Sequence, residues 1–348
     1  MSPILEGMPT TATSTLDGEY RALRESCGLI DRSKRGKLAL RGSGAVEFLN
    51  GQVTNELDEL HPGEGCYAAF LTHKGKMLGD LRILARGADP LGVPDELLLD
   101  TERVALQALF DMIRRFKVGY EVELHKRTLE RGLLSLIGPN ADRVAGVASP
   151  LSAAAGMEPA ESVWLKATEH ANAPVIVRSI DALAIRTDIG VDLLCDSADT
   201  ERLCEALLER GTQAVSETAA ECLRIEHGRP RYGIDLDDTT IPQEAGLNER
   251  AVSFTKGCYV GQETVARLFY RGKPNRRLCG LRLSEAALPG AELRLDERVV
   301  GRLTSAAVSP AFGPIGLALV RREAEIGTTV AVGEDGVSAE VVALPFAD

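Results

Sequence analysis

The sequence predicts an α+β protein whose C-terminal part is all-β. Up to about residue 275, short apolar strands alternate with helices of clear 3.6-residue period. From about Arg277 onward, short β-like runs separated by turn residues replace the helical pattern, as is typical of a small antiparallel barrel. We therefore expect a loose tail in residues 1–20, two α+β subdomains in residues 21–275 and a β-barrel in residues 276–348.

The composition fits a folded protein and excludes several functional classes. The chain has 348 residues, of which 44% are hydrophobic and 26% are charged, so it can bury a sizeable core. A net charge of −11 argues against a nucleic-acid partner, which requires a broad basic face. Because the sequence has no apolar run of membrane-spanning length and no secretory signal pattern, we expect a cytoplasmic protein with no membrane partner.

The cysteines favour free thiols in a reducing compartment. The chain has seven of them, an odd number at wide spacings, with no C-x-x-C pair and no Cys/His cluster of zinc-site type. An iron–sulfur cluster held by this chain alone would need about four convergent thiolates, and the spacing does not group them. We therefore predict no metal site.

The first elements can be placed in order along the chain. A strand at "KLALR" leads to a helix for which Ser43 is the expected N-cap and Gly51 the end. Short strands follow at "GCYAAFL", "LGDLRIL" and "DELLLD". The segment "TERVALQALFDMIRRF" is expected to be an amphipathic helix with Leu106, Leu109, Ile113 and Phe116 on its apolar side.

A second α+β unit is expected after the strand "YEVELHKRTL". It contains "LLSLIGPNADRVAG", strands around "ALAIRTDIGVDLLCD", and a helix from about Asp199 to Gly211. The expected barrel strands lie in "RRLCGLRL", "AELRLDERVVGRLTSAAVS", "PIGLALV" and "TVAVGEDGVSAEVVAL".

A carboxylate ends the apolar face of the next predicted helix, which runs between an N-cap at Ser216 and a C-terminal glycine at Gly228. Its stripe consists of Ala219, Cys222, Leu223 and Glu226. A buried carboxylate requires hydrogen-bond donors. They could come from an ion pair with Arg224, Arg229 or Arg231, or from a ligand such as an amino-pyrimidine ring, which presents two N–H groups.

The stretch "FTKGCYVGQETVARLF" places a cysteine near the start of another predicted helix. Gly257 and Gly261 flank Cys258, and Lys256 precedes it; glycines allow close approach of the backbone to a ligand. A helix N-terminus and a lysine favour a thiolate, so a reactive thiol is the preferred interpretation. The alternative is an ordinary buried cysteine, the interpretation we prefer for the other six, including Cys204 and Cys222.

Two further features concern charge. Residues 251–277 contain six basic residues and one acid, Glu263, which favours an anionic partner such as a ligand's carboxylate tail. Asp80 follows a glycine-rich turn, where an aspartate is either a turn residue or an acid or base facing a cleft. The six basic residues are Lys256, Arg267, Arg271, Lys273, Arg276 and Arg277.

The motif "KGCYVGQE" resembles the signature of the YgfZ family of folate-binding proteins, which support iron–sulfur cluster assembly. It consists of Lys256, Gly257, Cys258, Tyr259, Gly261, Gln262 and Glu263 with Val260. The segments "GLIDRSKRGKLALRGSGAVEFLNGQVTNEL", "KGKMLGDLRI" and "RIEHGRPRYGIDLDDTTIPQEAGL" follow the same family order. The wider superfamily includes the glycine cleavage T-protein, which lacks the cysteine motif.

The resemblance implies a T-protein-like fold, with two α+β parts and a barrel around a central channel that holds tetrahydrofolate. It implies that Glu226 holds the pterin ring and that Asp80 lies by the folate nitrogens. We add Arg224 and Arg267 as folate contacts, and we assign catalysis to Cys258 and Asp80.

The predicted function is support for assembly or repair of 4Fe–4S clusters in client enzymes, with tetrahydrofolate or a derivative as cofactor. The predicted partners are folate and iron–sulfur client or assembly proteins. Two alternatives stay open: a folate-dependent aminomethyltransferase, which the superfamily fold favours, and a non-catalytic folate-binding adaptor.

Overall fold

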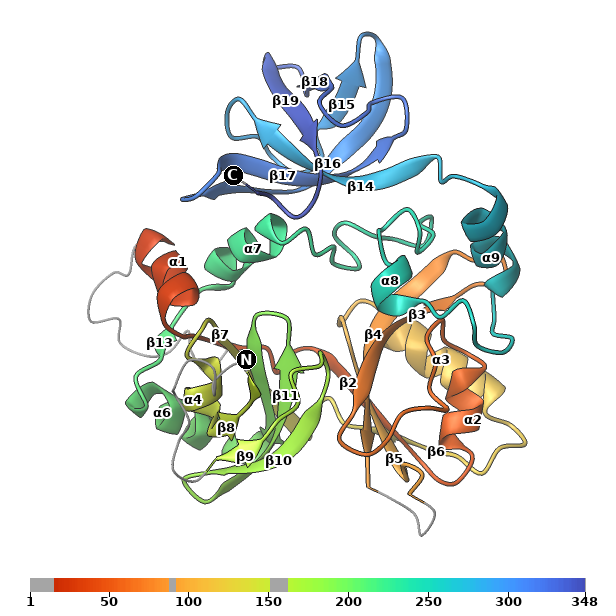
Figure 1. Cartoon of the computed structure of the whole chain (residues 1–348), viewed down its shortest axis with the longest axis vertical. Coiled ribbons are helices and arrows are strands. Elements are labelled where there is room, and N and C mark those ends of the chain that lie inside the picture. Colours follow the sequence, from red (N-terminus) through yellow and green to blue (C-terminus); the bar gives the residue numbers. More distant parts are fainter. Residues whose placement is uncertain (1–15, 88–91, 151–161, 348) are drawn as a thin grey trace. The chain divides into compact units, whose positions relative to one another are not determined.

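The computed structural model describes residues 16–87, 92–150 and 162–347 (Figure 1). The chain forms two compact units, and each is assembled from three separate stretches of the sequence. Unit 1 takes the described residues of Met1–Asn50, Leu57–Tyr67 and Leu81–Ala219. Unit 2 takes the described residues of Gly51–Glu56, Ala68–Asp80 and Ala220–Asp348.

One sheet of unit 1 has the strand order β10-β11-β12-β7-β1-β13. Its pairs are antiparallel except β1 with β13. Alternate residues of a strand point to opposite faces, so Leu193 of β12 enters one core and Leu194 another. The strands are β1 (Gly28–Asp31), β7 (Arg131–Ile137), β10 (Asn172–Val177), β11 (Ile180–Thr187), β12 (Gly190–Asp196) and β13 (Gln213–Ala214).

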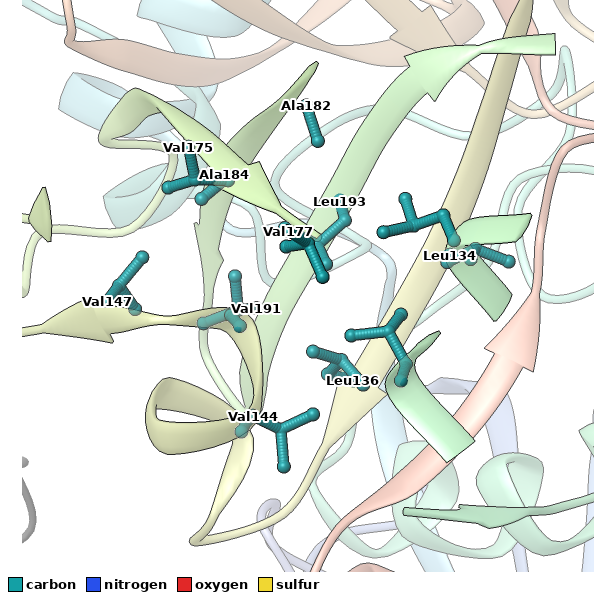
Figure 2. Close-up of a cluster of buried hydrophobic side chains, with 14 of the residues drawn as sticks. Leu134, Leu136, Val144, Val147, Val175, Val177, Ala182, Ala184, Val191 and Leu193 are labelled. Atoms are coloured by element: carbon teal, nitrogen blue, oxygen red, sulfur yellow. The ribbon is translucent and has the colours of Figure 1, made fainter. Parts of the chain in front are cut away.

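Helices cover the first of these cores. Figure 2 shows Leu134 and Leu136 of β7 beside Val191 and Leu193 of β12, with Val144 of a short helix close by. The flanking elements are α1 (Leu16–Glu25), α4 (Ala141–Ala145), β8 (Val147–Ala148), β9 (Val163–Trp164), the 3₁₀ turn η2 (Ser197–Asp199) and α6 (Thr200–Glu209).

A second sheet has the order β3-β4-β5-β2-β6. Within unit 1, Leu84 and Leu98 from this sheet share a buried cluster with Leu133, Leu183 and Leu194 of the first sheet. The elements are β2 (Gly36–Arg41), α2 (Ala45–Asn50), β3 (Gly65–Leu71), β4 (Met77–Arg86), β5 (Glu96–Thr101), α3 (Leu106–Phe116) and β6 (Glu123–Lys126).

The C-terminal strands of unit 2 close into an antiparallel barrel of order β14-β17-β16-β15-β18-β19, which confirms the predicted α+β body followed by a β-barrel. Its interior is aliphatic, with Leu281, Leu303 and Val320 fully buried. The elements of this part are α7 (Glu217–Glu226), α8 (Asn248–Ala251), α9 (Gln262–Arg271), β14 (Arg276–Leu283), β15 (Glu292–Leu295), β16 (Arg298–Ser309), β17 (Gly313–Arg321), β18 (Thr329–Val332) and β19 (Val337–Val342).

Two predicted helix starts are wrong. The helix expected from Thr101 begins at Leu106, because Thr101 still pairs in the sheet as the last residue of β5. Ser43 does not cap α2, since its hydroxyl donates to Glu121 Oε2 at 2.7 Å and the helix begins at Ala45. The predicted tail lies outside the described residues up to residue 15, and α1 begins at Leu16.

Candidate functional site

The cysteine motif forms the loop between α8 and α9 in unit 2. All seven cysteines lie in the described ranges and are free, and Cys258 alone among them is exposed. The helix expected at the motif starts only at Gln262, with Gly261 as its N-cap in the left-handed conformation. The thiol therefore precedes the first helical residue by four positions. Its chemical character rests on exposure, not on a place in the first turn.

Gly261 fixes the downstream end of this loop. Its φ is +85°, and a Cβ there would lie 2.5 Å from the carbonyl oxygen of Thr72. On the facing turn between β3 and β4, Gly75 also lies close to a neighbour: a Cβ at Gly75 would lie 2.8 Å from Thr264 Cβ. The two glycines let the turn and the start of α9 interlock. Gly257, by contrast, would place a Cβ within 4 Å of nothing that the structure describes.

Lys256 fixes the upstream end of the loop. Its side chain is buried, and its Nζ donates to the carbonyl oxygens of Val53 at 3.1 Å and Asn55 at 2.5 Å. The ammonium also lies 5.4 Å from the ring centroid of Tyr259, whose pKa burial raises to about 12. The motif lysine thus ties the loop to residues 51–56, and its charge is directed to backbone carbonyls.

The six basic residues around the motif do not form one cationic surface. Lys256 is committed as described, Arg276 pairs with Glu244 at 3.0 Å, and Arg277 donates to the Ala324 carbonyl at 3.4 Å. Their charges are used inside unit 2. The exposed basic residues are Arg267, Arg271 and Lys273, beside the exposed rings of Phe269 and Tyr270.

Glu226 is a buried carboxylate at the C-terminal end of α7, as the apolar stripe predicts. It is 1% exposed, and Ser309 at the end of β16 donates from Oγ to Glu226 Oε1 at 2.5 Å. The same Oγ accepts the backbone N–H groups of Ala311 and Phe312, which orients the hydroxyl toward the carboxylate. The backbone carbonyl of Glu226 accepts from Phe346 N–H at 2.8 Å.

Both predicted ends of α7 are observed. Ser216 Oγ accepts the Ala219 N–H at 3.3 Å, and Gly228 adopts a φ of +65°. The rest of the stripe, Ala219, Cys222 and Leu223, is at most 3% exposed.

Arg224 turns to acceptors other than Glu226. All three of its guanidinium nitrogens are engaged: with Glu221, with Asp235 Oδ2 at 2.7 Å and with Ser305 Oγ at 2.7 Å. Asp235, whose side chain is fully buried, also accepts from Thr304 Oγ1 and Ser305 Oγ. The geometry therefore gives Arg224 a positioning role between α7 and β16. Asp235 was missed from the sequence, although it follows two arginines in "RPRYGID".

Asp80 lies inside β4 instead of at its start and is 5% exposed. Its charge acts on Tyr232: burial first, and then the charges of Asp238, Asp237 and Asp80, raise the pKa of Tyr232 to about 12. Tyr232 therefore keeps its phenolic proton at neutral pH and remains a hydrogen-bond donor. The sequence offered a weak signal for it, as the aromatic residue of "RPRYGIDLDD".

Comparison with protein families identifies the two parts of the chain. The GCVT N-terminal domain matches residues 8–256, and the glycine cleavage T-protein C-terminal barrel domain matches residues 276–348. The chain belongs to the glycine cleavage T-protein family. This confirms the T-protein superfamily that the resemblance implied and the fold expected from it.

Several relatives are similar over nearly the whole chain. The aminomethyltransferase of Geobacillus kaustophilus is 30% identical over 96% of this chain and 90% of its own length. A putative chloroplastic transferase of Arabidopsis thaliana is 29% identical over 90% of this chain and 70% of its own length. The crystal structure of glycine cleavage system aminomethyltransferase T from Bartonella henselae superimposes with a TM-score of 0.81 at 25% identity, covering 98% of this chain and 91% of that one.

Two further observations concern metal sites and membrane-spanning helices in the described ranges of this T-protein family member. No group of three or more His, Cys, Asp or Glu side chains there is arranged to hold a metal ion. None of the helices in those ranges combines the length and apolar character needed to cross a membrane.

Proposed function

We propose that this T-protein family member binds tetrahydrofolate and catalyses a folate-dependent aminomethyl transfer. Relatives named aminomethyltransferases align over nearly the full chain, which places this alternative ahead of the predicted iron–sulfur role. The structural observation that carries the proposal is the buried carboxylate of Glu226, oriented by Ser309 within unit 2.

The donor chemistry of tetrahydrofolate fits this carboxylate. Each carboxyl oxygen can accept more than one hydrogen bond, so an N–H group of a pterin ring can share the Glu226 side chain with the Ser309 hydroxyl. Burial at 1% exposure makes such charge-assisted bonds stronger than they are in water. Arg224 supports the arrangement indirectly, by fixing α7 against Ser305 and Asp235.

The residues around Tyr232 supply the second part of the proposed site. When bound, tetrahydrofolate would supply the ring nitrogens that accept the one-carbon unit. Asp80, Asp237 and Asp238 create a negative potential that would stabilise a cationic amine. Asp80 would accept a proton or an N–H bond from that amine, and the protonated phenol of Tyr232 would donate a hydrogen bond.

The test combines a binding and a turnover measurement on the full chain. Calorimetric titration with tetrahydrofolate should show binding that Glu226→Gln weakens by about tenfold or more, the loss expected for one charged hydrogen bond. Glu292→Gln, a half-exposed carboxylate on β15, is the matched control and should bind like the wild type. Equal affinities for the two variants, or no binding by the wild type, would overturn the proposal.

Turnover is measured in a glycine-cleavage assay with an aminomethyl-lipoyl carrier. Asp80→Asn should lower kcat by about 100-fold or more, as expected for loss of a proton acceptor, with a smaller effect on folate affinity. Circular dichroism melting of each variant shows whether it is folded. Folate binding by the wild type without any turnover would contradict aminomethyl transfer.

The exposed Cys258 keeps the iron–sulfur role as a second candidate function. A folate-binding protein of the YgfZ type would use this thiol toward a client protein, and the loop presents it to solvent. Cys258→Ser should then lower the cluster content of client enzymes in cells, while Cys66→Ser on β3 should not. Normal cluster content of client enzymes in cells that carry Cys258→Ser would exclude this role. If the protein binds folate but shows no turnover and no dependence of client enzymes on Cys258, the non-catalytic adaptor is the function that agrees with the results.

A further inference from the structure

A large concave surface in unit 1 is rich in arginine. Its volume is about 1140 Å³, comparable to that of a cofactor-sized ligand site. Among the residues that the structure describes, its lining has five arginines and one carboxylate, Asp181. In a chain of net charge −11, this is a strong local excess of positive charge. The arginines are Arg86, Arg131, Arg143, Arg178 and Arg210.

Three of these arginines come from three different elements. Arg143 lies on α4, Arg178 in the turn between β10 and β11, and Arg210 caps the end of α6. Arg210 is held in place, because its Nη1 donates to the Val144 carbonyl at 2.7 Å. Gly146 lies against this guanidinium, since a Cβ there would be in van der Waals contact with Nη1 at 3.5 Å.

The fold keeps these positive charges together at an electrostatic cost. Burial and the neighbouring Arg178 guanidinium both lower the pKa of Arg210, which shows that the two cations oppose one another. Arg178 pairs with Glu209 and Arg131 with Asp196, but both carboxylates are more than half exposed. Such exposed pairs offset little of the repulsion. An anion in the groove would offset it directly.

The turn that carries Arg178 is the two-residue loop of the β10–β11 hairpin, in which Val177 pairs with Ile180. Arg178 and Ser179 adopt φ values of 47° and 64°, in the left-handed region that residues with a side chain rarely occupy. Positive φ at both loop residues is the geometry that a tight two-residue hairpin turn requires, and it holds Arg178 at the end of the hairpin. Beside this turn, the groove is lined by apolar side chains that include Pro174 and Ile176, the latter 69% exposed.

We propose that this groove binds an organic phosphate of nucleotide size. Guanidinium groups match phosphate oxygens in bidentate geometry, so Arg143, Arg178 and Arg210 would hold the phosphates. Pro174 and Ile176 would contact the organic part. This site is separate from the proposed aminomethyl transfer and needs none of the residues assigned to folate.

The experiment is calorimetric titration of the full chain with ATP, tripolyphosphate and adenosine at about 50 mM and about 300 mM salt. ATP should bind at low salt and more weakly at high salt, since the contacts are ionic. Arg143→Gln should weaken ATP by about tenfold or more. The matched control is Arg202→Gln, an arginine on α6 that is 62% exposed and outside the groove; it should change the affinity less than twofold.

The following outcomes would overturn the proposal, in whole or in part. Absence of ATP binding at low salt, or equal weakening by Arg143→Gln and Arg202→Gln, would show that the groove is not a phosphate site. If tripolyphosphate binds as tightly as ATP, the groove recognises phosphate groups and makes no contact with the organic part of the ligand. Arg210→Lys keeps the charge but loses the bidentate geometry, so it should weaken ATP binding while circular dichroism melting shows that the variant is folded. Glu226→Gln should leave ATP affinity unchanged, which separates this site from folate binding.

Discussion

Replacing Gly261 with alanine should destabilise the loop that presents Cys258. At this position alanine suffers twice: it must adopt a φ of +85°, and its Cβ would lie 2.5 Å from the Thr72 carbonyl oxygen. Gly290 provides the matched control, since it has a φ of +98° but nothing that the structure describes lies within 4 Å of a Cβ there. The difference between the two alanine variants isolates the close contact with Thr72.

The magnitudes follow from these two terms. A left-handed alanine costs about 1–2 kcal/mol, and the reduced entropy of the unfolded chain returns about 0.4–1 kcal/mol. Gly290→Ala should therefore lower the free energy of unfolding by about 1 kcal/mol. Overpacking against a backbone oxygen adds about 1–3 kcal/mol at Gly261, so Gly261→Ala should lose about 2–4 kcal/mol.

Hydrogen exchange followed by mass spectrometry is the suitable assay, because it reports on the loop without assuming two-state unfolding of a two-unit chain. In Gly261→Ala, residues 256–271 should lose protection, including the Val260 N–H that donates to Gly51 O at 3.3 Å. In Gly290→Ala this segment should exchange as in the wild type. Equal protection of the segment in both variants would refute the argument from the Thr72 contact.

Three further predictions concern buried groups. Lys256→Met leaves the Val53 and Asn55 carbonyls without its ammonium and should lower the free energy of local opening of residues 256–271, measured by hydrogen exchange, by about 2–3 kcal/mol. The exposed Lys273→Met should change it by less than about 0.5 kcal/mol, and similar losses in the two variants would contradict the anchoring role. Burial raises the pKa of Cys27 and Cys222 to about 12 and that of Cys204 to about 11. Iodoacetamide at pH 8 should therefore alkylate the exposed Cys258 first, as measured by peptide mapping. Early labelling of the other three thiols would refute their burial. Burial lowers the pKa of Lys37 to about 8. Between about pH 8 and 10.4 the unfolded chain therefore binds more protons than the folded chain, and the contribution of Lys37 to stability rises with pH. Lys37→Met should lack this rise, and parallel profiles of stability against pH for the variant and the wild type would exclude the lowered pKa.

Local patterns were sufficient for much of the fold. The stripe from Ala219 to Glu226, with Ser216 and Gly228 at its ends, predicted α7 and its buried carboxylate because helical spacing alone fixes which side chains share a face. The barrel was predicted because its strands are short, alternating and consecutive, and the first observed strand begins at Arg276.

The parts that escaped prediction depend on distant segments. Lys256 looked like a neighbour that would activate the thiol, but its partners are Val53 and Asn55, about 200 residues earlier in the chain. Thr101 looked like the first residue of a helix, but its pairing with Gly36 and Leu81 keeps it in the sheet. Asp235 and Tyr232 acquire their roles only through β16 and Asp80, contacts that no local spacing indicates.

The anchoring of Lys256 has a consequence for the order in which the chain can fold during synthesis. Residues 51–56 and 68–80 belong to unit 2 although the rest of that unit begins at Ala220. Val53 leaves the ribosome 203 residues before the lysine that binds its carbonyl. At typical rates of synthesis this interval is roughly 10–40 s. Unit 1 can therefore complete its core before residues 51–56 and 68–80 can pack against the rest of unit 2, which has not yet been synthesised. We expect those segments to be where a ribosome-associated chaperone contacts the nascent chain.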